Sequence, residues 1–191
     1  MRGNDTLRIL GISGSLRNGS YNTALLSAAG TLVSEGEDFI TLSLDNIPMY
    51  NADLEAAGDP EPVSRLKREI ASADGLLLAT PEYNYSVSGA LKNALDWASR
   101  PPRSSPLQGK PIAIMGVGGM LGTVRAQMHL REILLHSDAR VLSRPEVYVS
   151  RGSGKFDAQG KLIDEPTRLQ LKKLMRAFRE WILHWKLEPA H

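Results

Sequence analysis

Short apolar runs alternate along this chain with segments whose apolar residues recur every three or four positions. The first run, residues 7–12, ends in a stretch rich in Gly and Ser, which predicts a buried strand that runs into a loop. The next segment, residues 23–33, has the apolar spacing of one helical face. The pattern recurs four more times. It predicts strands at 7–12, 39–44, 75–79, 111–117 and 140–149, and helices at 23–33, 62–72, 89–98, 124–136 and 167–185.

This alternation indicates right-handed crossovers between parallel strands, with helices on both faces of the sheet. We therefore expect an α/β fold: a doubly wound, five-stranded parallel sheet in a three-layer α/β/α arrangement. A length of 191 residues with 42% hydrophobic content fits a single domain spanning residues 1–191. Residues 150–164, which contain Gly and Lys, are either a mobile loop or an ordered excursion.

Composition narrows the classes of function. With 23 basic and 21 acidic side chains, the net charge of +2 gives no reason to expect nucleic acid as a partner. The chain has no cysteine, which excludes disulfides and thiolate chemistry, so redox chemistry would need a bound cofactor. Residues 1–6 are polar and precede only six largely apolar residues, too few for a signal-peptide core or a membrane span. We expect a cytoplasmic protein with no membrane partner.

In a doubly wound sheet, ligands bind beyond the carboxyl ends of the strands. Three predicted loops at that edge carry the candidate chemistry, namely residues 13–22, 81–88 and 116–122.

The first of these loops opens directly into a helix and concentrates hydrogen-bond donors. A helix N-terminus favours anions, and hydroxyls, an amide and a guanidinium add donors around it. We interpret the loop as a phosphate cradle, suited to a monophosphate ester because it lacks a Walker-type lysine. The alternative is that Ser20 or Asn22 is only an N-cap and Arg17 a solvated charge. The candidate residues are Ser13, Ser15, Arg17, Ser20, Tyr21 and Asn22.

The second loop is aromatic with polar edges. Tyr83 and Tyr85 suit the flanks of a planar ring, and Asn84 suits the edge of a heterocycle. The alternative is a tight turn whose two tyrosines cover the core. Pro81 and Glu82 complete the candidate set, and for Glu82 we favour a backbone-positioning or interface role over that of a general acid.

The third loop, residues 116–122, is glycine-rich. Leu121 occupies the place of the last glycine in a dinucleotide fingerprint, so a Rossmann-type NAD site is not expected. Gly118 and Gly119 instead suit close approach of the backbone to a flat ligand. A flexible connection without ligand contact is the alternative.

Taken together, these motifs resemble the NADPH-dependent FMN reductase family, the flavodoxin-like group that includes bacterial quinone, chromate and azo-dye reductases. The resemblance rests on Gly14 to Arg17 with Ser20 and Asn22, on Pro81 to Asn84, and on Ser88 to Trp97; it extends from Ile9 to about Val149. It implies noncovalent FMN, NADPH or NADH as the donor, and a homodimer or homotetramer.

We therefore expect an NAD(P)H-dependent FMN oxidoreductase that passes two electrons to a small acceptor such as a quinone, chromate or an azo compound. No side chain need act as a catalytic acid or base, because the flavin carries the chemistry. His129, His136, His184 and His191 have no spacing typical of a metal site or a triad. The alternatives are an FMN reductase that supplies reduced flavin to a partner, a flavodoxin-like electron carrier, or a flavin-sensing module.

Overall fold

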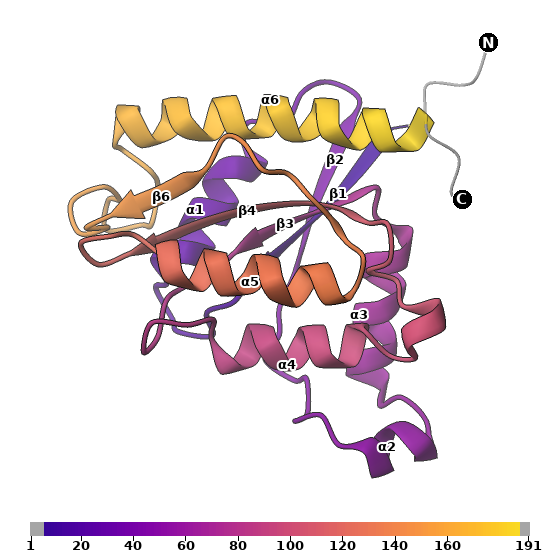
Figure 1. Ribbon diagram of the computed structural model, residues 1–191. Helices are drawn as coiled ribbons and strands as arrows, with labels where there is room; N and C mark the ends of the chain where they lie inside the picture. The colour runs from indigo at the N-terminus through magenta and orange to yellow at the C-terminus, as the bar shows by residue number, and fades with distance from the viewer. Residues whose placement is uncertain (1–5, 188–191) are drawn as a thin grey trace.

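The computed structural model describes residues 6–187 and shows one parallel sheet between two helical layers (Figure 1). The strand order is β2-β1-β3-β4-β5, with β6 also paired to β4, and every pairing is parallel. This is the order of flavodoxin-like sheets, so the predicted fold class is confirmed. The strands are β1 (Leu7–Ser13), β2 (Glu37–Leu42), β3 (Gly75–Ala79), β4 (Pro111–Gly118), β5 (Arg140–Val141) and β6 (Val147–Ser150).

Two hydrophobic clusters fill the space on either side of the sheet. One contains Leu25 of α1 and Phe178 of α6, and the other contains Leu66 of α3, Leu91 of α4 and Leu130 of α5. Figure 1 shows the same division, with α6 and α1 on one face and α3, α4 and α5 on the other. The helices are α1 (Tyr21–Gly30), α2 (Ala52–Ala57), α3 (Glu61–Ser72), α4 (Gly89–Ala98), α5 (Val124–His136) and α6 (Glu165–Leu187), with a 3₁₀ turn at Pro102–Ser104.

No helix within residues 6–187 is long and apolar enough to cross a membrane. The expectation drawn from residues 1–6 lies almost wholly outside the described residues, as does His191.

The fifth predicted strand, residues 140–149, is wrong as a single element. It is divided into β5, which pairs with the start of β4, and β6, which pairs with its end. Pro145 lies between them and has no N–H to donate to a ladder, so pairing is interrupted there. The sheet therefore has six strands instead of five.

Residues 151–164, called the strap below, form an ordered excursion, which was one of the two expected alternatives. An antiparallel bridge joins Phe156 to Leu162 within it. The Asp164 carboxylate accepts hydrogen bonds from the backbone and hydroxyl of Thr167 and pairs with Lys155 at 3.0 Å. These contacts lower the pKa of Asp164, with the Thr167 hydroxyl contributing most. The strap is thus anchored to the first turn of α6.

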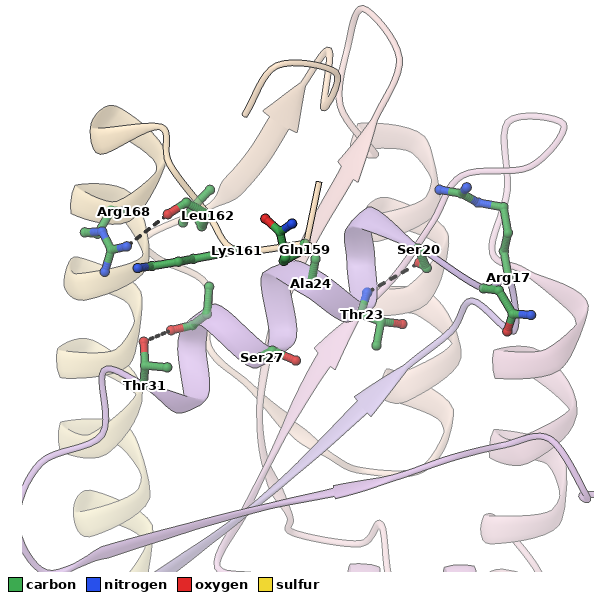
Figure 2. A pocket seen from close by; sticks show the side chains of 14 residues that line it. Arg17, Ser20, Thr23, Ala24, Ser27, Thr31, Gln159, Lys161, Leu162 and Arg168 are labelled. Atoms are coloured by element: carbon green, nitrogen blue, oxygen red, sulfur yellow. Dashed lines mark hydrogen bonds between the residues drawn. The ribbon is translucent and has the colours of Figure 1, made fainter. Parts of the chain in front are cut away.

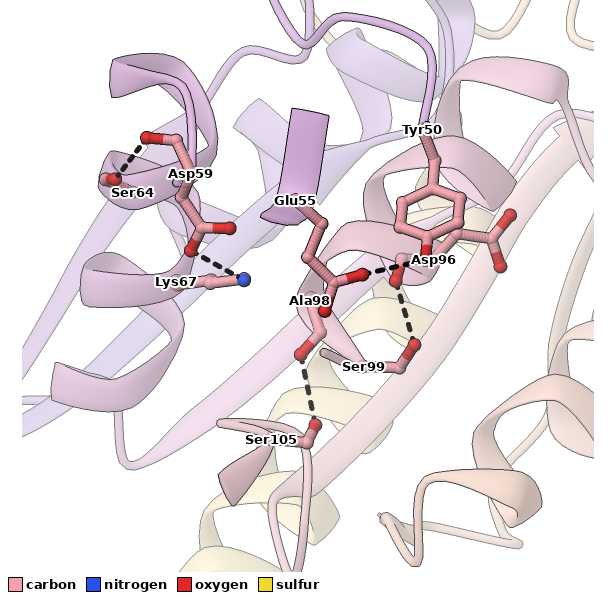
Figure 3. Close-up of polar contacts among 9 residues, drawn as sticks. All are labelled: Tyr50, Glu55, Asp59, Ser64, Lys67, Asp96, Ala98, Ser99 and Ser105. Atoms are coloured by element: carbon pink, nitrogen blue, oxygen red, sulfur yellow. Dashed lines mark hydrogen bonds and ion pairs between the residues drawn. The ribbon is translucent and has the colours of Figure 1, made fainter. Parts of the chain in front are cut away.

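The short helix α2 was not predicted, because its single turn and a half gives no readable apolar period. Polar contacts hold the connection around it against α3 and α4 (Figure 3). The Tyr50 hydroxyl donates to Glu55 at 2.8 Å, and Lys67 pairs with Asp59 at 2.6 Å. The indole of Trp97 on α4 donates to the Pro48 carbonyl. The hydrogen bond with Glu55 raises the pKa of Tyr50.

The close packing around the end of β4 can be tested by glycine substitutions. A Cβ added at Gly116 would overlap the Thr123 hydroxyl and the Thr80 carbonyl, whereas one added at Gly89 meets nothing within 4 Å. We expect Gly116→Ala to lower the free energy of unfolding by about 2 kcal/mol or more. The matched Gly89→Ala, in the first turn of α4, should leave it unchanged or raise it by about 0.5 kcal/mol. Urea denaturation followed by circular dichroism measures both, and equal stability of the two variants would contradict the packing described.

Candidate functional site

The three candidate loops leave the sheet side by side. Ser13 at the end of β1 is in register with Ala79 at the end of β3, and Ala79 is in register with Met115 of β4. The loops that follow these strands therefore meet at one edge of the sheet, as the sequence predicted.

Hydroxyl groups shape the first loop from within. The Ser20 side chain is the N-cap of α1 and accepts hydrogen bonds from the backbone N–H groups of Asn22 and Thr23. The hydroxyl of Ser13 accepts from the Ser15 N–H, and the hydroxyl of Ser15 accepts from the Arg17 N–H. The N-cap alternative is thus observed for Ser20.

Four backbone donors of the same loop have no partner within residues 6–187. They are the N–H groups of Leu16, Asn18, Gly19 and Tyr21. The Arg17 guanidinium makes no ion pair within these residues and lies 5.7 Å from the centre of the Tyr21 ring. Unpaired N–H groups, a guanidinium and a helix N-terminus together form a site suited to an anion such as a phosphate ester.

Asn22 joins the first loop to the third. Its amide nitrogen donates to the Val117 carbonyl at 3.0 Å, and its amide oxygen accepts from the Val117 N–H at 2.9 Å. The side chain is 4% exposed. Asn22 therefore links α1 to β4, a role different from both the ligand contact and the N-cap expected from the sequence.

The second loop projects two tyrosines from a tight turn. Tyr83 and Ser86 exchange backbone hydrogen bonds, and Asn84 and Tyr85 between them have φ of 48° and 65°. These are the angles of a type I′ turn, which Asn adopts more readily than Tyr. Tyr83 is 52% and Tyr85 66% exposed, so they do not cover the core. A tight turn was one of the expected alternatives, but the expectation that its two tyrosines cover the core was wrong.

Contacts on both sides hold the second loop in place. The Glu82 carboxylate accepts from the backbone N–H groups of Arg125 and Ala126 at 3.0 and 3.1 Å, and so caps α5. This is the positioning role that we favoured. The Ser88 hydroxyl, which the sequence analysis missed as a site residue, donates to the Gly14 carbonyl at 2.6 Å. A Cβ at Gly14 would lie 3.0 Å from Pro81, so the first and second loops pack directly together.

The face of the second loop that looks toward α5 is also engaged. The Arg125 guanidinium lies 4.0 Å from the centre of the Tyr85 ring, within cation–π range. The Ser86 hydroxyl lies 2.9 Å from Nδ1 of His129. His129 therefore contacts the candidate site, although its spacing gave no sign of this.

The third loop is shorter than the predicted segment 116–122, because residues 116–118 are the end of β4 and the turn that follows bridges Gly119 to Gly122. The two candidate glycines differ in what surrounds them. A Cβ at Gly118 would overlap the Gly122 carbonyl, so the turn itself requires this glycine. A Cβ at Gly119 would meet nothing within 4 Å, which leaves its backbone open to a ligand. The sequence alone does not distinguish these two glycines.

The strap supports the first and third loops from outside. The Phe156 ring stacks on Tyr21 with centroids 5.3 Å apart and planes 18° apart. The Arg151 N–H donates to the Gly119 carbonyl at 3.0 Å. Sequence reasoning missed this support, and its one visible signal is an isolated aromatic residue in a polar segment.

Comparison with known proteins identifies the same family that the sequence motifs resemble. Residues 7–154 match the model of the family described as NADPH-dependent FMN reductase. The chain is 49% identical to an NAD(P)H-dependent FMN reductase of Pseudomonas aeruginosa, over 93% of this chain and 96% of the relative. It is 40% identical to a quinone reductase of Escherichia coli, over 96% of this chain and 99% of the relative.

A solved structure agrees with the fold in detail. The flavoenzyme NAD(P)H:acceptor oxidoreductase FerB of Paracoccus denitrificans superposes with a TM-score of 0.85 at 37% identity, covering 93% of this chain and 98% of that one. The expected resemblance is confirmed, and it extends over more of the chain than the segment from Ile9 to Val149. On these grounds, the chain belongs to the NADPH-dependent FMN reductase family, a family of flavin-dependent oxidoreductases that use NAD(P)H.

Proposed function

We propose that this protein is an NAD(P)H-dependent FMN oxidoreductase that passes two electrons to small acceptors such as quinones. The observation that carries the proposal is the convergence of an anion-suited loop, an aromatic turn and an open glycine backbone at the carboxyl edge of the sheet. Relatives that cover nearly the whole chain are named as FMN reductases and quinone reductases.

The first loop suits the phosphate of FMN. Its four unpaired N–H groups and the Arg17 guanidinium supply donors, and Ser13, Ser15 and Ser20 hold the loop in the shape that presents them. Tyr21 contributes through its ring, which lies between Arg17 and Phe156. Asn22 acts indirectly, by fixing the start of α1 against β4.

The second and third loops suit the isoalloxazine ring. Tyr83 and Tyr85 are exposed and supply aromatic faces, while Asn84 supplies an amide at the turn. Gly119 lets the backbone approach a flat ligand, and Gly118 allows the turn that places it. Pro81 and Glu82 position the loop without needing to touch the ring.

FMN, when bound, supplies the two-electron chemistry between the nicotinamide donor and the acceptor. The chain's own residues bind and orient the ligands. The Glu82 carboxylate is occupied by two N–H groups of α5, so it is engaged in positioning and not poised as a general acid. The unpaired N–H groups and exposed aromatic faces hold the ligands, and the glycines admit them.

We further propose that the protein works as a homodimer or homotetramer. Exposed apolar side chains supporting a self-association surface gather on the third loop and α5, namely Met120, Leu121, Met128 and Leu135. Sedimentation of the purified protein decides this state.

The first functional test is the visible spectrum of the purified protein, followed by anaerobic addition of one equivalent of NADPH. We expect flavin absorbance that copurifies and bleaches on addition. A bound flavin that stays oxidised with both NADPH and NADH would identify a carrier or sensor. A colourless protein whose added FMN turns over with NADPH would identify a reductase that releases its flavin. A protein that fails to bind FMN would contradict the proposal.

The phosphate assignment predicts that Arg17 distinguishes FMN from riboflavin. Because a hydrogen bond to a charged group is worth about 1.5–3 kcal/mol, Arg17→Ala should weaken FMN binding by roughly 10- to 100-fold. Riboflavin, which lacks the phosphate, should bind the variant and the original protein alike. Flavin fluorescence titration measures both constants. Arg65→Ala, at an exposed arginine of α3, is the matched control and should change neither. Equal losses for FMN and riboflavin would place the phosphate elsewhere.

A further inference from the structure

A groove of about 880 Å³ continues outward from the first loop along the solvent face of α1 (Figure 2). Its floor is α1, one wall is the strap, and α6 closes the far end. A Cβ at Gly160, at the tip of the strap, would lie 3.9 Å from Cβ of Ala24, so the strap runs directly over the first turns of α1.

The lining of this groove is rich in donors and has no acidic side chain. Three cations from three separate segments line it, namely Arg17 of the first loop, Lys161 of the strap and Arg168 of α6. Ser27, Thr31 and Gln159 add polar groups, while Ala24, Ala28 and Leu162 provide apolar surface. A cavity of this size and chemistry suits an organic anion larger than inorganic phosphate, with one flat apolar part.

The charge of Lys161 is not paired by any group within residues 6–187. Within residues 6–187 its ammonium group has no carboxylate within 4 Å and no hydrogen-bond acceptor, whereas Lys155 of the same strap is paired with Asp164. Arg168 donates to the Leu162 carbonyl and lies 3.6 Å from Glu165, so its charge is partly balanced. Figure 2 shows the Lys161 side chain pointing toward α6, where Arg168 lies.

The geometry points to this groove as the binding site for the adenosine 2′-phosphate end of NADPH, with Lys161 as the residue that selects NADPH over NADH. The inference rests on the proposed function. The donor must place its nicotinamide at the flavin, and the groove begins at Arg17 to Ser20, the loop that suits the flavin phosphate. Ser20 and Ala24 are one helical turn apart, about 6 Å, so the strap tip lies one turn along α1 from the loop that suits the flavin phosphate.

NADPH and NADH differ chemically at one position. NADPH and NADH share adenine, both riboses and the pyrophosphate, which suit the apolar surface and the polar groups that α1 and the strap contribute to the groove. Only NADPH carries the 2′-phosphate, a dianion that an unpaired ammonium group stabilises. Loss of Lys161 should therefore affect one donor and spare the other.

The test compares Lys161→Ala with the original protein in steady-state kinetics and in direct binding. Since one charge-assisted contact is worth about 1.4 kcal/mol or more, we expect KM for NADPH to rise about tenfold while KM for NADH and both kcat values stay unchanged. The direct probe is adenosine 2′,5′-bisphosphate, titrated calorimetrically into the FMN-loaded protein. Its dissociation constant should rise by the same factor, while that of AMP should not change.

Lys173→Ala is the matched control, because Lys173 is an exposed lysine of α6 outside the groove. It should leave all of these constants as they are. A fall in affinity for NADPH and NADH alike in Lys161→Ala, or equal binding of adenosine 2′,5′-bisphosphate and AMP by the original protein, would overturn the inference. If FMN binds but neither donor reduces it, the proposed function fails, and the titration with adenosine 2′,5′-bisphosphate still decides what the groove binds.

Discussion

The parallel register of β1, β3 and β4 is the constraint on which the rest of this molecule depends. β1 and β3 end abreast at Ser13 and Ala79, beside Met115, and β4 continues to Gly118, so the chain leaves the sheet three times at one edge. Crossover helices on both faces then carry it back. This register alone brings three segments that are far apart in the sequence together at one edge of the sheet.

Polar side chains convert that shared edge into a defined surface. Ser88 fastens the second loop to the first through the Gly14 carbonyl, and Asn22 fastens the first helix to the end of β4 through Val117. Glu82 connects the second loop to α5. Each of these groups is satisfied by backbone partners, as buried polar groups require. The donors left over, on the backbone of the first loop and on Arg17, are those that we propose bind the phosphate of FMN.

Much of this arrangement was predictable from the sequence, because the strongest signals are local. Buried strands such as β3 are short apolar runs and amphipathic helices such as α5 have a clear apolar period, and the bounds of both agree with the prediction. The loops were found because Gly, Ser and Tyr cluster where strands end. Pro145 divides the last strand and was passed over, because the apolar pattern runs on through it. The roles of Asn22 and Ser88 depend on partners about 95 and 74 positions away, which no local pattern reveals.

The strap has fixed ends and an open tip. Arg151 is tied to Gly119, Phe156 to Tyr21, and Asp164 to the start of α6, whereas the tip, Gln159 to Lys161, is hydrogen-bonded to Asp157 of the same strap and lines the groove. On the inference made above, side-chain substitutions at the tip should alter which donor binds, while the contacts at the two ends of the strap remain. Donor preference would then depend on a surface side chain, and a change of preference would not require the loops that the strap supports to be rebuilt.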